Sequence, residues 1–287
     1  MMRAGIQKIG RRLGMLAVVC LLGGLLSATL VRFAPGYGMD ERELEPGLSP
    51  ATVAAIRSSH HLDSGILSYY GHYLAGAVRG DLGNSEWLER PISSLIQERF
   101  PVTARSVASG VLLAWVLALA ICLPGFHFRS FSIELSGTLL SGVLIALPAV
   151  VIAMFSVYLR APAFIAIAVV TFPKLFRYLR NMIAHAYAQP CVLAARARGI
   201  GPARILFCHI LPLVRPALLA LLGVSLSLAF GAAIPIEALC DSPGVGQLAW
   251  QAALNRDLPL IMNLTMLVTL ITVTANSLAN LANESAL

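Results

Sequence analysis

Charged residues are scarce in this sequence: they make up 12% of its 287 residues, about half of the roughly 25% that is usual in soluble domains. The shortage excludes a disordered chain, which needs low hydrophobicity and high charge, and it argues against an ordinary soluble enzyme. Lysine is the rarest charged residue, with only Lys8 and Lys174 present. Neither lysine follows a glycine, so the sequence lacks the GK[ST] loop that binds nucleotide phosphates.

Residue sets typical of catalysis or metal binding are also missing. The five cysteines are scattered and form no CxxC pair, so neither a disulfide framework nor a zinc site follows. No Ser/His/Asp set and no paired carboxylates stand at a credible spacing, and we predict no catalytic residue, cofactor or metal. Two interpretations are possible for three histidines of the outer segment, His60, His61 and His72. They could pass a metal ion along, or they could be ordinary solvent-exposed side chains. The absence of a carboxylate or thiol at ligand spacing favours the second interpretation.

Long hydrophobic runs are what the sequence does contain. Hydrophobic residues make up 57% of the chain, and a membrane-spanning helix uses about 20 consecutive ones. The sequence therefore predicts an all-α polytopic membrane protein with about six transmembrane helices. The first run is longer than the core of a signal peptide, about 7–15 residues, so we expect a retained anchor. The predicted spans are Leu13–Val31, Val102–Leu123, Leu135–Leu159, Ala163–Leu179, Ala217–Ile236 and Leu260–Leu281.

The charges sort by position along the chain, and this sorting predicts the orientation. Residues 32–99 hold six basic and nine acidic residues, whereas residues 174–215 hold seven basic residues and no acidic one. By the positive-inside bias, the first segment lies outside and the second is a cytoplasmic loop, with both termini in the cytoplasm. The same bias explains the net charge of +7. Nucleic-acid binding is not predicted, because it needs basic residues gathered on one soluble face.

The outer side is predicted to carry two short helices within residues 32–99. Ser49 and Pro50 suit the N-cap and the first position of one helix. Apolar and tyrosine residues at helical spacing within 66–78 suit a second helix at the membrane interface. Between the third and fourth spans only residues 160–162 remain, which predicts a tight outer hairpin.

The most informative part of the cytoplasmic segment is Ala194–Pro212. It is predicted to form a small-residue helix that stops at Gly199, followed by a second short helix. Glycine takes the left-handed conformation that ends a helix, and Gly201-Pro202 suits the start of the next one. The second helix begins with an apolar knob on a loop that no lipid covers, which predicts a protein partner. The knob is Ile205, Leu206 and Phe207.

This stretch resembles the EAA loop of ABC importer permeases, whose pattern is Glu-Ala-Ala, three residues, glycine, nine residues, isoleucine, one residue and Leu-Pro. Leu193 stands in place of the glutamate and His209 in place of the isoleucine. Both departures resemble the dipeptide, oligopeptide and nickel branch, which reads Thr-Ala-Arg-Ala-Lys-Gly and Phe-Arg-His-Ile-Leu-Pro there. The similar residues are Ala195-Arg196-Ala197-Arg198-Gly199 and Phe207-Cys208-His209-Ile210-Leu211-Pro212.

Five more stretches resemble motifs of the same branch. They follow the order of the branch along the chain, and each falls on the side of the membrane that the charges predict. One of them resembles the motif that opens the type I permease domain. The five stretches are Arg32–Gly36, Arg79–Ser85, Arg99–Thr103, Ser242–Gly246 and Asn255–Pro259.

The resemblance implies a type I ABC importer transmembrane domain at residues 101–283, after an anchor helix and a periplasmic segment at residues 1–100. It implies a bacterial inner-membrane permease that pairs with a second permease subunit, two ATP-binding cassette subunits and a periplasmic substrate-binding protein. It also implies that the EAA loop is a coupling helix in contact with the ATPase. The implied contact residues are Ala194, Ala195, Arg196, Ala197, Arg198, Gly199, Ile205, Leu206, Phe207, His209, Leu211 and Pro212.

Alternatives to a transporting permease stay open at the sequence level. The loop between the third and fourth spans is shorter than in the family, and Asn280 replaces an aspartate of the sixth span. Both departures are compatible with a paralogue that does not transport, or with a membrane scaffold. A secondary transporter would carry charges at mid-span, whereas these spans are almost free of charge. The solute is not readable, and peptide, nickel and other solutes remain open.

Single residues in the spans allow two interpretations each. Glu237, at the outer end of the fifth span, is a candidate for the outer gate, with a solvated loop residue as the alternative. Three prolines lie within predicted spans, namely Pro148, Pro173 and Pro235. Each could be a hinge that takes part in gating or a kink that the helix tolerates, and the sequence favours neither. His209 is predicted to pack within the loop, because nothing nearby relays a proton.

Overall fold

The computed structural model describes residues 66–127 and 131–285, together with residues 14, 17–19, 21–27, 29, 30 and 33. The described chain is helical, with one isolated β-bridge between Asn84 and Pro91. It divides into two compact units. The smaller unit is Met1–Glu98 with Ala249–Leu270, and the larger unit is Arg99–Leu248 with Ile271–Leu287.

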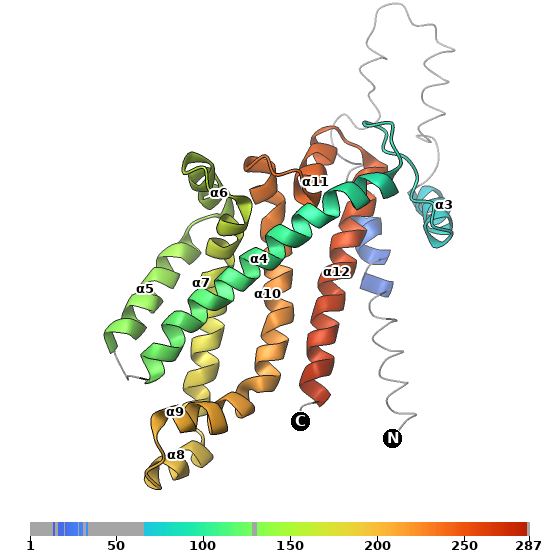
Figure 1. Ribbon diagram of the computed structural model, residues 1–287. Helices are drawn as coiled ribbons and strands as arrows, with labels where there is room; N and C mark the ends of the chain where they lie inside the picture. The colour runs from blue at the N-terminus through green and yellow to red at the C-terminus, as the bar shows by residue number, and fades with distance from the viewer. Residues whose placement is uncertain are drawn as a thin grey trace, which may run out of the picture. The chain divides into compact units, whose positions relative to one another are not determined.

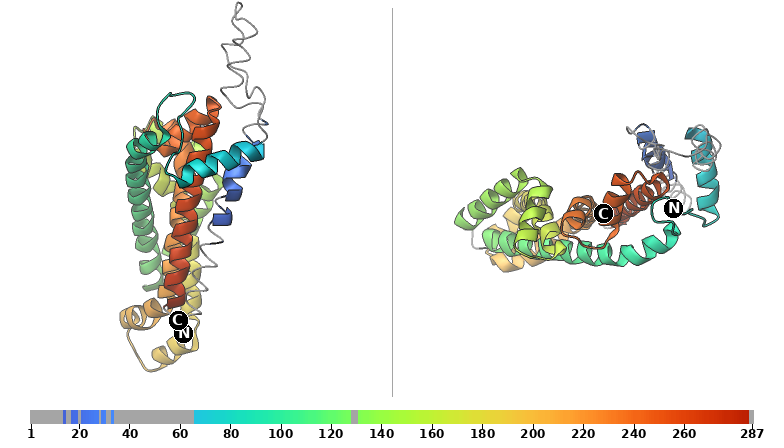
Figure 2. Two further views of the ribbon diagram at one scale, coloured as in Figure 1. Left: turned by 90° about the vertical axis from the view of Figure 1, so that its right-hand side faces the viewer. Right: turned by 90° about the horizontal axis from the view of Figure 1, so that it is seen from above.

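The larger unit holds most of the helices. In this unit α7 packs against α5, α6 and α10, while α8 and α9 lie at one end of α7 and α10 (Figures 1 and 2). The first turn of α11 lies at the other end of α10. The elements are α4 (Ile92–His127, from Arg99 onward), α5 (Phe131–Ala146), α6 (Ala149–Tyr158), α7 (Ala163–Tyr187), α8 (Pro190–Ala197), α9 (Pro202–Ile205), the π-helical turn η2 (Leu206–Ile210), α10 (Leu211–Leu239), the start of α11 (Val245–Leu254) and the end of α12 (Leu258–Ser285).

Small residues let the helices of the larger unit approach closely. A Cβ at Gly223 of α10 would lie 2.9 Å from the Ala275 carbonyl oxygen and 2.7 Å from the Ala279 Cβ of α12. A Cβ at Gly110 of α4 would lie 2.8 Å from the Ile167 side chain of α7. Packing through small residues is the usual way in which membrane helices associate, because lipid tails are as apolar as the helix surfaces.

The third predicted span, Leu135–Leu159, is sharply bent at Pro148, one of the three prolines for which a hinge or a kink was predicted. The chain there forms α5 and α6, whose axes differ by 98° across a short break. Pro148 lies at the break with φ −59° and ψ 145°. Proline lacks the amide N–H of a helical hydrogen bond and disfavours helical geometry in the residue before it. Pro173 and Pro235 are instead accommodated within the continuous helices α7 and α10.

The all-α membrane class is confirmed, whereas the number of six spans stays a prediction. Three described helices are long and apolar enough to cross a membrane: α4, the continuous helix Pro202–Leu239, and α12. The bent pair of α5 and α6 makes a fourth if it counts as one span. The first predicted span is described only in part, by helical residues between 17 and 30. Helix α7 covers the fourth predicted span but carries three basic residues in its second half.

Two predicted segment boundaries need correction. The basic segment 174–215 is not a simple loop, because its first part is the second half of α7, which runs to Tyr187. The fifth span, predicted to begin at Ala217, is part of a helix that begins at Pro202. In both cases the helix continues past the last strongly apolar residue, since charged side chains do not prevent a helix outside the hydrocarbon.

The smaller unit contains α3 (Ile66–Val78) and the first half of α12. Its buried centre is formed by Tyr70, Leu258 and Met262. The Tyr70 hydroxyl donates to the Leu21 carbonyl oxygen at 2.7 Å, which ties α3 to the first helical segment. The second predicted short helix is confirmed as α3, and its position at the outer surface stays a prediction, while the helix predicted to begin near Ser49 lies outside the described residues.

Candidate functional site

The predicted glycine stop is confirmed at the end of α8. Gly199 has a φ of +75°, and its amide donates to the Arg196 carbonyl at 2.9 Å, while the Ile200 amide donates to the Ala195 carbonyl at 3.2 Å. These two bonds form the Schellman motif that caps a helix with glycine. Gly201 then adopts an extended conformation before Pro202 begins α9.

The predicted second short helix is not a separate element. Helix α9 continues through η2 into α10, so that one helix runs from Pro202 to Leu239. The wide turn at Leu206–Ile210 precedes Pro212, whose missing N–H leaves the Cys208 carbonyl without its ordinary helical partner. Helix α9 is therefore the first turn of the continuous helix that includes η2 and α10.

The predicted exposed knob is wrong for two of its three residues. Ile205 and Leu206 are buried in a cluster with Val192 and Ala195 of α8 and with neighbouring residues of η2 and α10. Phe207 is 62% exposed. The helical turn explains this split, because it directs residues 205 and 206 toward α8 and residue 207 away from it. The outward apolar side chains of this region include Leu193, Phe207 and Leu211.

The remaining members of the predicted contact set divide between surface and interior. Arg196 is half-buried, with its guanidinium 4.9 Å from the centre of the Tyr187 ring, a cation–π contact. Ala195 is buried, and His209 is half-buried with a buried Nδ1 that has no hydrogen-bond partner among the described residues. The exposed members are Ala194, Ala197, Arg198, Gly199, Phe207, Leu211 and Pro212.

At the opposite end of α10, two of the sequence motifs meet at Glu237. The carboxylate is fully buried, and its Oε2 accepts hydrogen bonds from the Thr103 hydroxyl at 2.9 Å and from the Gly246 amide at 2.8 Å. The Thr103 hydroxyl oxygen in turn accepts from the Val245 amide at 2.7 Å. The motifs Arg99–Thr103 and Ser242–Gly246 are therefore joined through this carboxylate. The solvated-loop interpretation of Glu237 is wrong.

The glycines of Ser242–Gly246 are explained by the space that Glu237 occupies. A Cβ at Gly244 would overlap the Glu237 carboxylate and lie 2.5 Å from the Thr103 hydroxyl oxygen. A Cβ at Gly246 would lie 2.8 Å from the Ala233 carbonyl oxygen of α10. Real side-chain carbons do not approach backbone this closely, so only glycine allows this turn to pack on α10.

In the smaller unit, a second pair of motifs meets at Asp257. The Asp257 Oδ2 accepts from the Ser85 hydroxyl and from the Trp87 amide, the latter at 3.2 Å. Its Oδ1 accepts from the Leu260 amide at 3.0 Å, which caps the start of α12. The motifs Arg79–Ser85 and Asn255–Pro259 are thus held together by one buried carboxylate.

A tyrosine reinforces this second cluster from α3. The Tyr73 hydroxyl donates to Asn263 Oδ1 at 2.7 Å, and the Asn263 amide donates to the Leu82 carbonyl at 3.1 Å. Burial, with a smaller effect of Tyr70, raises the pKa of Tyr73 to about 12. The phenol therefore stays protonated, and remains a donor, throughout the physiological pH range.

Comparison with known proteins decides the family. Residues 110–285, more than half of the chain, match the family described as the binding-protein-dependent transport system inner membrane component. The chain belongs to this family of permeases. The match contradicts the secondary-transporter alternative, because members work with separate components of a binding-protein-dependent system.

Several full-length relatives support the same assignment. The oligopeptide transport system permease protein OppB of Salmonella typhimurium strain LT2 is 28% identical, with 85% of each chain covered. OppB of Escherichia coli K12 gives the same values. A protein of Brucella suis biovar 1 named as a peptide permease is 26% identical, over 98% of this chain and 97% of its own.

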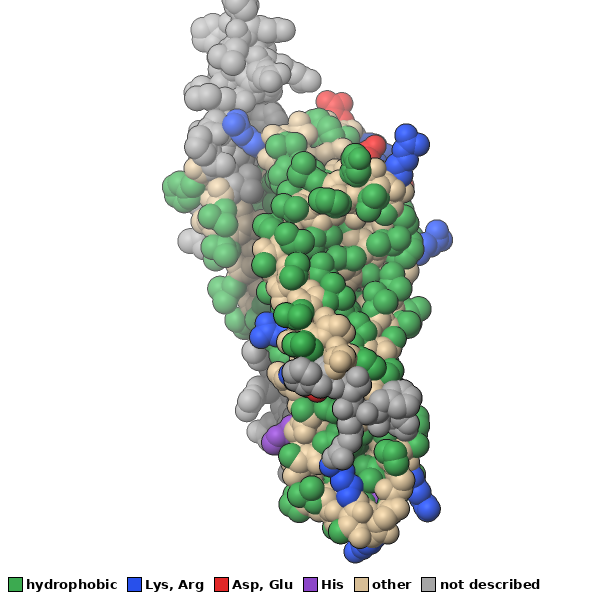
Figure 3. Space-filling view, turned by 90° about the vertical axis from the view of Figure 1, so that its left-hand side faces the viewer, with side chains coloured by type: hydrophobic (Ala, Val, Ile, Leu, Met, Phe, Trp, Pro, Cys, Tyr) green, Lys and Arg blue, Asp and Glu red, His purple; other side chains and the backbone are tan. Residues whose placement is uncertain are grey.

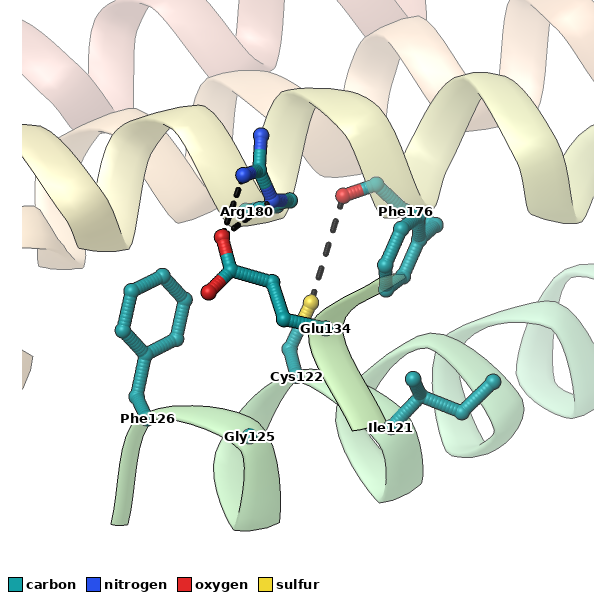
Figure 4. Close-up of a pocket in the computed structure, with 7 residues that line it drawn as sticks. All are labelled: Ile121, Cys122, Gly125, Phe126, Glu134, Phe176 and Arg180. Carbon is teal, nitrogen blue, oxygen red and sulfur yellow. Dashed lines mark hydrogen bonds and ion pairs between the residues drawn. The ribbon is translucent and has the colours of Figure 1, made fainter. Parts of the chain in front are cut away.

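Outside these clusters, the described residues of the larger unit include a partly buried ion pair between Arg180 and Glu134. The Arg180 guanidinium on α7 donates to Glu134 Oε1 on α5, with Nε at 2.9 Å and a second, shorter contact from its terminal nitrogen. Figure 4 shows the two side chains pointing toward each other beside Cys122, whose thiol lies 3.9 Å from the Phe176 carbonyl oxygen. The pair neutralises two charges where α5 and α7 pack.

Some predicted features cannot be placed. His60, His61 and the motif Arg32–Gly36 fall mainly outside the described residues, as do the side chains of His72 and Asn280. The joining of the other motifs was missed by sequence reasoning. The sequence did contain one signal for the cluster at Glu237. This signal is a single acidic residue at the end of an apolar helix, followed by two closely spaced glycines.

Asp257→Asn is expected to lower the free energy of unfolding of the permease by about 1.5–3 kcal/mol, because an amide NH₂ would replace an acceptor that faces buried donors. Thermal denaturation in detergent would measure it. Asp81→Asn is the matched control, since this exposed carboxylate accepts a local bond from the Gly83 amide and no other described bond. Equal melting temperatures for the two variants would show that the Asp257 cluster carries no stability.

Proposed function

We propose that this chain is one of two membrane subunits of an ATP-driven importer that moves peptides delivered by a periplasmic binding protein. Two observations support this proposal. The first is that the relatives carry peptide-permease names. The second is that the α8–α9 end of the larger unit has the apolar side chains Leu193, Phe207 and Leu211 exposed, and not packed between helices. Such side chains suit a socket on a partner protein.

The mechanism follows from the continuity of α9 with α10. An ATPase subunit binds Phe207 and its neighbours, and nucleotide-driven closure of the ATPases moves α9. The buried contacts of Ile205 and Leu206 with α8 keep the two helices together, and the movement passes along α10 to the end where Glu237 holds α4 and the Ser242–Gly246 turn. In this proposal Glu237 is a gate element that acts by holding helices together.

The proposal keeps the predicted domain plan and topology. Residues 1–100 provide an anchor and a periplasmic segment, residues 101–283 provide the permease domain, and both termini lie in the cytoplasm. The partners are a second permease subunit, two ATP-binding cassette subunits, the binding protein and the lipid bilayer. ATP hydrolysis belongs to the ATPase subunits.

The topology gives a direct prediction. In a cysteine-free background, Ser58→Cys should react with a membrane-impermeant maleimide in intact cells, because residues 32–99 carry the acidic excess of the outer side. Ala203→Cys, which is exposed on α9, should react only after the cells are opened. The reverse pattern of labelling would contradict the orientation.

Peptide uptake into proteoliposomes tests the function. Vesicles would contain this permease, its second permease subunit and the two ATPases, with the binding protein outside and ATP inside. We expect ATP-dependent accumulation of a radiolabelled tripeptide mixture and no accumulation of ⁶³Ni²⁺. Accumulation of nickel without peptide would show that the transported solute is nickel and not peptide. An assembled complex that hydrolyses ATP but moves neither solute would favour the non-transporting paralogue.

A further inference from the structure

The second half of α7 has an exposed face that carries basic and polar side chains. Lys174, Arg177, Tyr178 and Asn181 are exposed at spacings of three and four residues, so they lie along one side of the helix. We name these four residues the basic face of α7. The other sides of α7 pack against α5, α6 and α10, with Leu175, Phe176 and Leu179 fully buried.

The cations of this face have no partner in the part of the chain that the structure describes. Arg180, one turn from Arg177, is paired with Glu134, whereas no hydrogen bond or ion pair joins Lys174 or Arg177 to a described residue. The other acidic side chains described in the larger unit, Glu237 and Asp241, belong to the region around the start of α11, at the far end of α10. Lys174 and Arg177 therefore form a positive surface that no described acidic side chain compensates.

The two cations lie where the uncharged first part of α7 ends. Lys174 and Arg177 follow Ala163 by 11 and 14 residues, which is about 17 and 21 Å at about 1.5 Å per residue. The residues 163–173 before them carry no charge. Lys174 begins the segment that the charges place on the cytoplasmic side, so this face lies toward the cytoplasmic end of α7, where an exposed basic side chain faces water and not lipid.

The exposed surface of α5 and α6 shows what a lipid-facing side of the same unit looks like. Its large exposed side chains are apolar and include Leu139, Val143, Met154 and Phe155. Hydrophobic side chains cover most of this side of the molecule in Figure 3. The larger unit thus has an apolar exposed surface on α5 and α6 and a basic one on α7, which are suited to two different surroundings.

We propose that the basic face of α7 lines the aqueous translocation path and attracts the carboxylate group of the passing solute. The proposal rests on the proposed function, because peptides carry a C-terminal carboxylate. An exposed cation gives a weak contact that is screened by water. A weak contact suits a path, since a solute that enters must also leave.

Cysteine accessibility tests the aqueous position of this face in the assembled complex. In a cysteine-free background, Lys174→Cys and Arg177→Cys should react with an anionic methanethiosulfonate reagent, and a saturating transported tripeptide should slow the reaction. Met154→Cys, on the apolar surface of α6, is the control and should react at least about tenfold more slowly, because thiolates form in water and not in lipid. Equal, slow reaction at all three positions would place the basic face against lipid or a partner and would overturn the proposal.

Transport by charge variants tests the role of the cations. The double variant Lys174→Gln/Arg177→Gln should reduce uptake of a tripeptide with a free C-terminal carboxylate by about tenfold. Arg160→Gln, in the exposed turn before α7, should retain wild-type uptake. Wild-type uptake by the double variant would refute the proposal but leave the proposed function intact. Failure of the wild-type complex to move peptide would refute the proposed function, and the cysteine reactions would still test whether α7 faces water.

Discussion

Gly246→Ala should lower the free energy of unfolding of the permease by about 1–3 kcal/mol, the cost of overpacking a rigid interior. The new Cβ would lie 2.8 Å from both the Ala233 carbonyl oxygen and the Ile234 Cα, and 2.9 Å from Glu237 Oε2. The first two are backbone atoms of α10, which cannot rotate away as a side chain would. Relief requires the start of α11 to move off α10, which breaks the bond from the Gly246 amide to Glu237.

Thermal denaturation of the purified permease in detergent would measure this effect, with Gly231→Ala as the control. Gly231 lies in α10 as well, but a Cβ there meets nothing within 4 Å, and alanine favours a helix interior over glycine. Gly231→Ala should therefore melt at or slightly above the wild-type temperature. A wild-type melting temperature for Gly246→Ala would mean that the turn does not pack on α10 as described.

Gly199→Val should abolish co-purification with the ATPase subunits while leaving the permease in the membrane. Gly199 has a φ of +75°, and a β-branched residue in this region costs about 1–2 kcal/mol or more. The strain arises within the local backbone, where the Cβ crowds its own carbonyl groups, and not from other parts of the fold, because a Cβ at this position meets nothing else within 4 Å. The chain would leave the left-handed conformation and redirect α9, so that Phe207 no longer fits its partner.

Gly201→Val provides the matched control for this effect. Gly201 lies two residues away, and a Cβ there also meets nothing within 4 Å, but its φ of −63° and ψ of 150° suit any residue before proline. Membrane fractions of cells that express the complete complex would be solubilised and purified through a tag on the permease. If both variants retain the ATPases equally, the Gly199 turn does not position the contact.

The helix stop and the apolar helices could be predicted from the sequence because each depends on local chemistry. Gly199 ends α8 through its own backbone freedom, and the spans follow from runs of apolar residues. The burial of Ile205 and Leu206 could not be predicted, because it depends on Val192 and Ala195 of another helix. Hydropathy alone also gives one span for Leu135–Leu159, since it does not distinguish a proline that bends a helix from one that breaks it.

The partners of the buried carboxylates were out of reach for a related reason. Glu237 bonds to Thr103, which lies 134 residues earlier in the chain, and Asp257 bonds to Ser85, 172 residues earlier. The motifs that contain these residues were recognisable one by one. Nothing in their local patterns says which motif meets which, because that pairing is set by how the helices pack.

Peptide-stimulated ATP hydrolysis in the reconstituted complex tests most directly whether this permease couples to ATPases through α9. Phe207→Asp places a charge at a 62% exposed side chain, so the permease should still fold, whereas an apolar socket would reject the charge. We expect the wild-type complex and Phe207→Leu to show stimulation by peptide-loaded binding protein, and Phe207→Asp to show none. Full stimulation with Phe207→Asp would contradict coupling at this position.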